Sequence, residues 1–183
     1  MTSENKKMPE IFHPLPDSLL DCPIDYIGRE HTRQMALCGY FRDKDLFTRM
    51  CRGEAQEAVR SLYSFLTQQL PVHVRDEQQA LFPLLIRYAG DADRKVRDGV
   101  RFVRREQEFD KSLIEFVLAD LETLHKGRAL VNPLRLELNL ETLLEGIDRH
   151  ARWERDHLLP EAEKALPLSA KQEIRERMAS WRD

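Results

Sequence analysis

The sequence predicts an all-α protein, an up-down four-helix bundle with a Pro-rich N-terminal arm and a short C-terminal helix. Only 7 of its 183 residues are glycine, while 42% are hydrophobic and 33% charged, a composition typical of helices with charged outer faces. Apolar residues also recur at helical spacing over four long stretches, and no strand signal of comparable strength competes with them. Because the breaks between these stretches are short, neighbouring helices are expected to run in opposite directions.

The four helices are expected within one domain, residues 24–166. We predict them at about residues 24–41, 54–89, 94–126 and, from a start between 134 and 141, up to 165. Residues 43–53 are expected to be a connection, 90–93 a turn and 127–133 a break. The start of the last helix stays open because four leucines alternate with the period of a strand, at positions 134, 136, 138 and 140. Pro71 lies inside the second helix and predicts a kink one turn before His73.

The two ends of the chain form separate regions. Residues 1–23 contain four prolines, which keep this arm extended, at positions 9, 14, 16 and 23. Residues 167–183 are predicted to form a short helix, because Ser169 is followed three residues later by Gln172 in the pattern of a capping box.

Charge and cysteine content exclude several classes of protein. Lys and Arg number 29 against 32 Asp and Glu, a net charge of −3, which argues against a nucleic-acid or membrane-surface partner. No apolar run approaches the roughly 20 residues of a membrane span, and the polar N-terminus lacks the apolar stretch of a signal peptide. Three cysteines without C-x-x-C spacing are typical of reduced thiols, so we expect a cytoplasmic protein.

Polar side chains interrupt the apolar stripe of every long helix. An unpaired polar group in a core costs about 1–3 kcal/mol, so such groups must share partners, and a metal ion is an economical shared partner. Imidazoles and carboxylates without a thiolate suit iron, manganese or zinc better than copper(I). The residues concerned are His31 in the first helix, His73 and Glu77 in the second, Gln107 and Asp110 in the third, and His150 and Glu154 in the fourth.

Two of these pairs belong to an internal repeat. The segment from His73 to Pro83 and the segment from His150 to Pro160 agree at five of eleven positions: the His, the Arg two residues later, the Glu, a Leu and the final Pro. In a helix, His and Glu four residues apart lie on one face, so both can reach the same ion or pair of ions. The repeat predicts that two halves of the bundle contribute equivalent ligands to one centre.

Over about residues 24–166 these features resemble the hemerythrin-like, HHE cation-binding family. The resemblance implies a bundle that holds a non-haem di-iron centre, with His31, His73, Glu77, His150 and Glu154 as ligands. It also implies a small partner such as O2, NO or peroxide, or a role in storing and donating iron. Whether the protein is an enzyme stays open.

The third helix departs from the family pattern. Gln107 stands where the family has a histidine, and a glutamine amide is a poor iron ligand. Asp110 lies about one turn further along the same face and is the candidate substitute. A mononuclear site is therefore an alternative to a di-iron site, and a helical scaffold or partner-binding protein with a degenerate site is the alternative function. The sequence does not indicate the oligomeric state.

Overall fold

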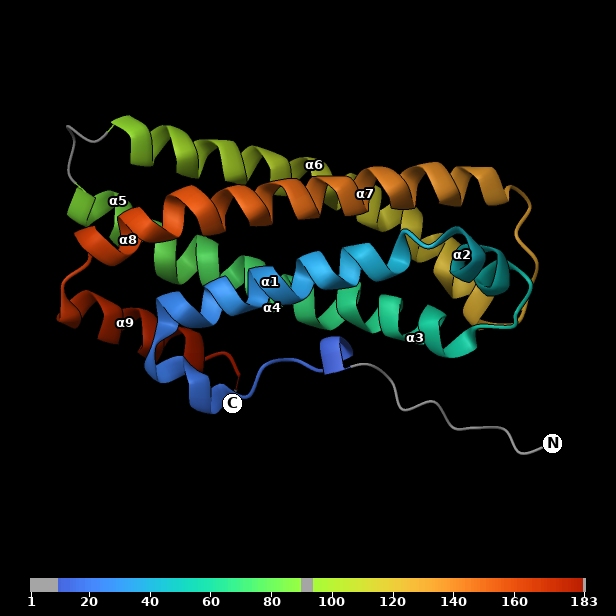
Figure 1. The fold of residues 1–183 in the computed structure, drawn as a ribbon, viewed down its shortest axis with the longest axis horizontal. Coiled ribbons are helices and arrows are strands. Elements are labelled where there is room, and N and C mark those ends of the chain that lie inside the picture. The colour runs from blue at the N-terminus through green and yellow to red at the C-terminus, as the bar shows by residue number, and fades with distance from the viewer. Residues whose placement is uncertain (1–9, 90–93, 183) are drawn as a thin grey trace.

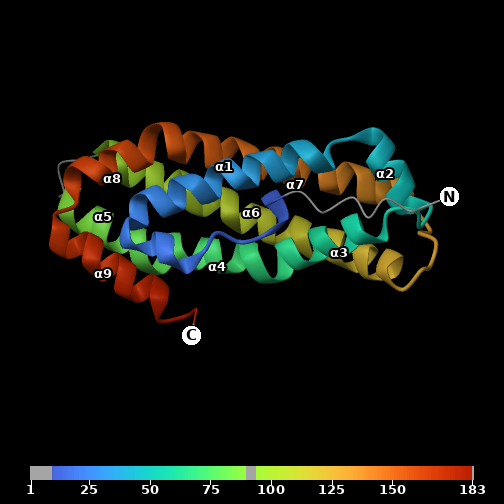
Figure 2. The ribbon, with the colours of Figure 1, turned by 60° about the horizontal axis from the view of Figure 1, so that its bottom comes forward.

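The computed structural model describes residues 10–89 and 94–182, and every regular element within these ranges is a helix (Figure 1). The long helical segments lie side by side along the long axis of the molecule (Figures 1 and 2). α1 packs on α7, α7 on α6, and α6 on α3 and α5. The prediction of an all-α protein is confirmed for this part of the chain. The segments are α1 (Pro23–Phe41), α3 (Gln56–Ser64), α4 (Leu70–Arg75), α5 (Phe82–Ala89), α6 (Arg94–His125), α7 (Pro133–Trp153) and α8 (Leu159–Ala165).

One local prediction was wrong, and one helix boundary that the sequence left open is now defined. Residues 43–53 contain a short helix, α2 (Lys44–Cys51), which begins where the side chain of Asp43 accepts a hydrogen bond from the Leu46 amide at 2.7 Å. The alternating leucines belong to α7, which begins at Pro133 after Asn132 caps the amide of Arg135. Leu136 and Leu140 are buried, whereas Leu134 and Leu138 are exposed, because residues four apart share a helix face.

Each proline inside a long helical segment follows a π-helical turn. Pro71 comes two residues after the π-helical segment Phe65–Gln69, Pro83 after Asp76–Leu81, and Pro160 after Glu154–Leu158. A proline ring clashes with the carbonyl four residues earlier and cannot donate a backbone hydrogen bond. The wider turn changes the hydrogen-bond register at this point. The distortion expected at Pro71 is therefore a π-helical turn within a continuous helical segment.

The termini lie along one side of the bundle. The described part of the arm contains 3₁₀ turns at Glu10–Phe12 and Asp17–Asp21, and residues 1–9 lie outside the described ranges. The last helix, α9 (Leu168–Ala179), begins after Pro167 without a side-chain cap, so the capping box expected at Ser169 does not form. Its packing against Asp76–Leu81 brings the C-terminal end of the chain back to the second helix. The turn predicted at 90–93 lies outside the described residues.

The core consists of two apolar clusters with a polar layer between them. On α1, Ile27 belongs to one cluster and Leu37 to the other, and His31 lies between them. On α6, Val103 and Val117 likewise lie on either side of the polar positions. A layer of buried polar side chains thus lies between the two clusters, while the buried Asp120 lies away from it and pairs with Arg135.

Among the described residues, no helix is long and apolar enough to cross a membrane.

Candidate metal centre

All seven predicted site residues lie in the polar layer. Each is at most 5% exposed. They come from every long segment: His31 from α1, His73 and Glu77 from α4 and the turn after it, Gln107 and Asp110 from α6, and His150 and Glu154 from α7 and the turn after it.

Glu77 lies at the centre of the layer. Its Oε1 atom is 2.8 Å from Nε2 of His31 and 2.9 Å from Nε2 of His73. The ligand atoms of these three residues all lie within 4.8 Å of one another, close enough to hold one ion. The structure therefore brings together ligands from the first and second helical segments, as the spacing predicts.

The second copy of the repeat lies next to this group. Oε1 of Glu154 is 4.0 Å from Nε2 of His31. His150 is one turn earlier, and its Nδ1 lies 3.5 Å from Oδ2 of Asp110. In both copies the histidine lies in the last turn of an α-helix, and the glutamate begins or lies within the π-helical turn that follows. Such turns occur often at functional sites.

The two polar residues of α6 differ in their contacts. Nε2 of Gln107 donates to Oε2 of Glu77 at 2.5 Å, and its Oε1 accepts from Gln78 at 2.8 Å. Gln107 thus fixes the second oxygen of Glu77. Asp110 faces α7, where a Cβ on Gly146 would lie only 2.8 Å from its Oδ1, so this glycine leaves room for the carboxyl group.

Burial and neighbouring charges shift the pKa values of the carboxyl groups in the layer in different directions. Burial opposes ionisation of Glu77, but His73 and His31 hold its pKa well below the usual range. Burial and the negative charge of Glu77 raise the pKa of Glu154 well above its usual range. Burial and the charge of Glu106 raise the pKa of Asp110 to about 7. These opposite shifts favour the ionised form of Glu77 and the protonated form of Glu154, whose proton a bound cation would displace.

The three imidazoles differ, and only those of His31 and His150 are shifted toward the neutral form. Burial lowers the pKa of His150 to about 4 and lowers that of His31 despite its contact with Glu77. Burial also opposes protonation of His73, but Glu77 outweighs this effect and raises its pKa. Neutral imidazole is the form that binds a metal ion.

Unpartnered buried atoms provide a test of whether these residues fit a metal. Within the described ranges, buried side-chain nitrogen or oxygen atoms without a hydrogen-bond partner belong to five residues: His31, Gln34, His73, His150 and Glu154. Four of the five are predicted ligands, and Glu154 has no partner at either oxygen. Since such atoms are costly in a core, the donor set fits a cation.

Sequence reasoning missed Gln34 and Gln78. Gln34 is fully buried, three residues after His31 on α1, and neither atom of its amide has a partner. The signal was present, because a polar residue at this spacing shares the inward face of His31. Gln78 is adjacent to Glu77 and acts through Gln107. Its contact depends on the π-helical turn, which spacing alone does not reveal.

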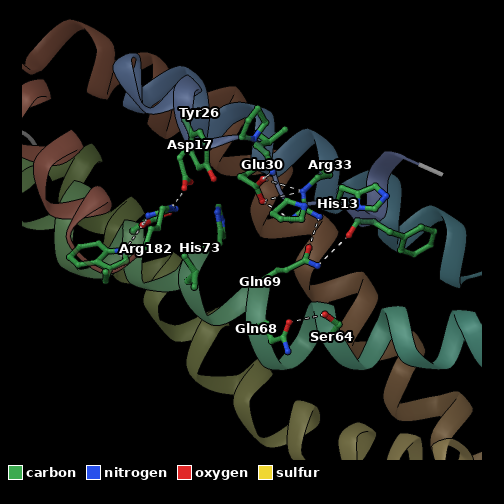
Figure 3. Close-up of a pocket in the computed structure, with 17 residues that line it drawn as sticks. His13, Asp17, Tyr26, Glu30, Arg33, Ser64, Gln68, Gln69, His73 and Arg182 are labelled. Atoms are coloured by element: carbon green, nitrogen blue, oxygen red, sulfur yellow. Dashed lines mark hydrogen bonds and ion pairs between the residues drawn. The ribbon is translucent and has the colours of Figure 1, made fainter. Parts of the chain in front are cut away.

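A cavity of about 720 Å³ adjoins the layer at His73. It lies between the N-terminal arm, α1, α4 and the C-terminal end of the chain, and Figure 3 shows His73 pointing toward it from α4. Arg33, which is paired with Glu30, donates to Gln69 at 2.8 Å and to the carbonyl of Ile11 at 3.0 Å, so it ties the arm to the bundle. Of the seven predicted site residues, His73 is the one that lines this cavity.

The opposite wall of the cavity is closed by the C-terminal end. Asp76 accepts hydrogen bonds from Trp181 at 2.8 Å and from Arg182. The guanidinium group of Arg182 also lies over the ring of Tyr26, 5.4 Å from its centroid. The charged groups of the wall are therefore paired with one another.

One comparison with known proteins identifies a family. The family model described as the hemerythrin HHE cation-binding domain matches residues 22–162. No curated protein and no solved structure gives a significant match.

Proposed function

Because the chain belongs to the hemerythrin HHE cation-binding domain family, we propose that its polar layer is an iron centre that binds or senses a small molecule such as O2, NO or peroxide, or handles iron. His31, His73, Glu77, His150 and Glu154 would hold the metal. We further propose two iron ions, as in other carboxylate-bridged bundle sites. Bound iron would supply the ability to coordinate and exchange electrons with a small molecule.

The observation that carries this proposal is the set of buried atoms without partners. Glu154 has two such oxygens, and His31, His73 and His150 each have an unpartnered Nδ1. A hydrogen-bonded core would leave few of these groups unmet. Cation binding explains Glu154 directly. A bound cation would favour the ionised carboxylate of Glu154 and would also be the partner that its two oxygens lack.

The α6 residues would position ligands. Gln107 holds Glu77 through one oxygen and leaves the other, Oε1, toward the imidazoles. Asp110 lies beside Nδ1 of His150 and would orient this ring, as carboxylates next to metal-binding histidines commonly do. Asp110 is also the proposed substitute ligand for the histidine that the third helix lacks.

The architecture that suits this function is an up-down four-helix bundle of residues 24–166, with residues 1–23 as an arm and 167–183 as a terminal region. We propose a cytoplasmic protein whose partner is a small molecule and neither a nucleic acid nor a membrane. Paired charges leave the cavity wall without a strong field of one sign, which suits a small uncharged reactant such as O2 or NO.

Filling the cavity beside His73 is expected to slow ligand entry. Val72 is half-buried in the cavity wall, so phenylalanine at this position narrows the route without altering a proposed ligand. In the iron-loaded protein, we expect Val72→Phe to slow the spectral change on mixing with nitric oxide several-fold, with iron content unchanged. Val131→Phe is the control, because Val131 is fully exposed and far from the cavity lining. An unaltered rate in Val72→Phe would show that the ligand enters elsewhere.

The alternative function is a scaffold whose polar layer works without metal. The contacts of Glu77 favour it, since this carboxylate already meets His31, His73 and Gln107. A scaffold would leave Glu154 unpartnered, however. A folded protein that takes up no iron from an excess of ferrous ions would establish this alternative.

A further inference from the structure

α6 presents a row of exposed phenylalanines away from the core. Phe102, Phe109 and Phe116 follow one another at seven-residue intervals, and their exposed fractions are 36%, 60% and 56%. Seven residues are close to two helical turns, so the three rings form one stripe, about 21 Å long. Phe102 contacts the ring of Trp153 at 5.4 Å between centroids, whereas Phe109 and Phe116 are more than half exposed. Exposed large apolar side chains in a row mark an interaction surface.

The charges of α6 divide into two halves at the middle of this stripe. Residues 94–105 contain six basic residues and one acidic residue, whereas residues 106–122 contain six acidic residues and one basic residue. Positive charge near the N-terminus of a helix opposes its dipole, so helix stability does not explain this order. Packing within the chain explains part of it, because Glu106 pairs with Arg149, Asp120 with Arg135 and Lys95 with Glu161.

The remaining charges beside the stripe are still ordered along it. Arg101 and Arg105 flank its N-terminal half, and Arg101 pairs only with Asp98 of the same helix among the contacts described for it. Glu115 flanks the C-terminal half. By helical angle, all three lie on the outer side of α6, next to the phenylalanines. In Figure 1 the N-terminal part of α6 runs along the upper edge of the bundle, and its C-terminal half passes behind α7.

We propose that two copies of this chain form an antiparallel dimer through the outer face of α6, with the two-fold axis passing at Phe109. A two-fold axis here brings Phe109 against its own counterpart and Phe102 against Phe116 of the second copy. It also places the basic half of each helix on the acidic half of the other, with Arg101 and Arg105 near Glu115 of the second copy. A parallel pair would instead align charges of the same sign. The surface is self-complementary, so it closes after two copies.

The first test is the mass of the protein in solution over a hundredfold range of concentration, by sedimentation velocity. We expect a dimer for the natural sequence and a monomer for Phe109→Glu and Phe116→Glu. Leu168→Glu is the matched control, because it adds the same charge at an 82% exposed leucine on α9 and is expected to leave the dimer intact. Natural protein that stays monomeric at every concentration, or a dimer that persists in both phenylalanine variants, would overturn the proposal.

The second test addresses the antiparallel arrangement. With the exposed Cys22 replaced by serine, we introduce Phe109→Cys or Phe102→Cys and oxidise the protein mildly. A cysteine on the two-fold axis meets its counterpart, so Phe109→Cys is expected to yield a disulfide-linked dimer. In the antiparallel dimer residue 102 faces residue 116 of the second copy, which is 14 residues away in the sequence. The two cysteines of Phe102→Cys therefore do not meet, and this variant is expected to stay unlinked. Equal cross-linking of both variants would contradict the antiparallel pairing. Circular dichroism establishes that each variant is folded, and none of these substitutions touches a proposed metal ligand.

Discussion

Replacing His73 by alanine is expected to remove most of the bound iron. The imidazole contributes one of three ligand atoms that converge within 4.8 Å, the one such group found among the described residues. His150→Ala is expected to act in the same way from the other copy of the repeat. We expect iron affinity to fall about tenfold or more in each variant, a loss at least as large as that seen when groups supporting a metal ligand are removed. The measurement is iron per chain by elemental mass spectrometry after dialysis.

His125→Ala is the control for both histidine variants. His125 ends α6 and its ring stacks near Tyr63 with centroids 6.5 Å apart, away from the polar layer. Its removal is expected to leave iron binding intact. Unchanged iron content in both His73→Ala and His150→Ala would rule out the proposed ligand set.

The two repeat glutamates are expected to respond differently to replacement by glutamine. The raised pKa of Glu154 favours its protonated form in the metal-free protein, so folding at neutral pH costs the uptake of a proton that Glu154→Gln does not need, and this variant is expected to be at least as stable as the natural metal-free protein. Glu77 is ionised and held between His31 and His73, so Glu77→Gln breaks charge-assisted contacts in the core. We expect Glu77→Gln to lower the free energy of unfolding by about 3 kcal/mol, as for other buried pairs that lose one partner. Both variants are expected to lose iron.

The pH dependence of the stability of the metal-free protein follows from the same pKa shifts. The folded-state pKa of Glu154 is raised, so its protonated form stabilises the metal-free protein at low pH, and this contribution is lost as pH rises through the raised pKa. Glu154→Gln does not titrate, so its stability relative to the natural protein is expected to increase as pH rises. For Glu77, with its lowered pKa, the stabilisation is present above the unfolded value and is lost only as pH falls through the folded one. Urea unfolding of metal-free proteins at several pH values measures both effects, and an equal loss of stability in the two variants at neutral pH would contradict this division.

Much of the candidate site follows from periodicity. The repeat at His73 and His150 predicts ligands on equivalent helices, and the structure brings both pairs into one layer with His31. The inference rests on two facts: core positions in a helix are set by spacing, and a polar residue at such a position needs a partner. The contact between Gln107 and Glu77 was not predictable in the same way, because it depends on the angle at which α6 packs on its neighbours.

The errors in the fold have local causes. The helix at Lys44–Cys51 was missed because it is only two turns long, too short for its apolar residues to establish a period. The leucines at the start of α7 alternate like a strand, yet Asn132 and Pro133 provide a cap and a first helical residue that decide the conformation. The capping box at Ser169 fails because Pro167 already starts α9 two residues earlier than that pattern requires. At α7 and α9, the residues at the helix start decide where the helix begins.

The most direct test of the central claim is the metal content of the natural protein, purified without chelator from cells supplied with iron. The proposed site predicts about two iron ions per chain. About one iron ion per chain would indicate a mononuclear site, in which the metal position that lacks a histidine because of Gln107 is not filled. Gln107→His would then be expected to raise the iron content. A folded, helical protein that contains no iron and takes up none from added ferrous ions would contradict the claim that the polar layer is a metal centre.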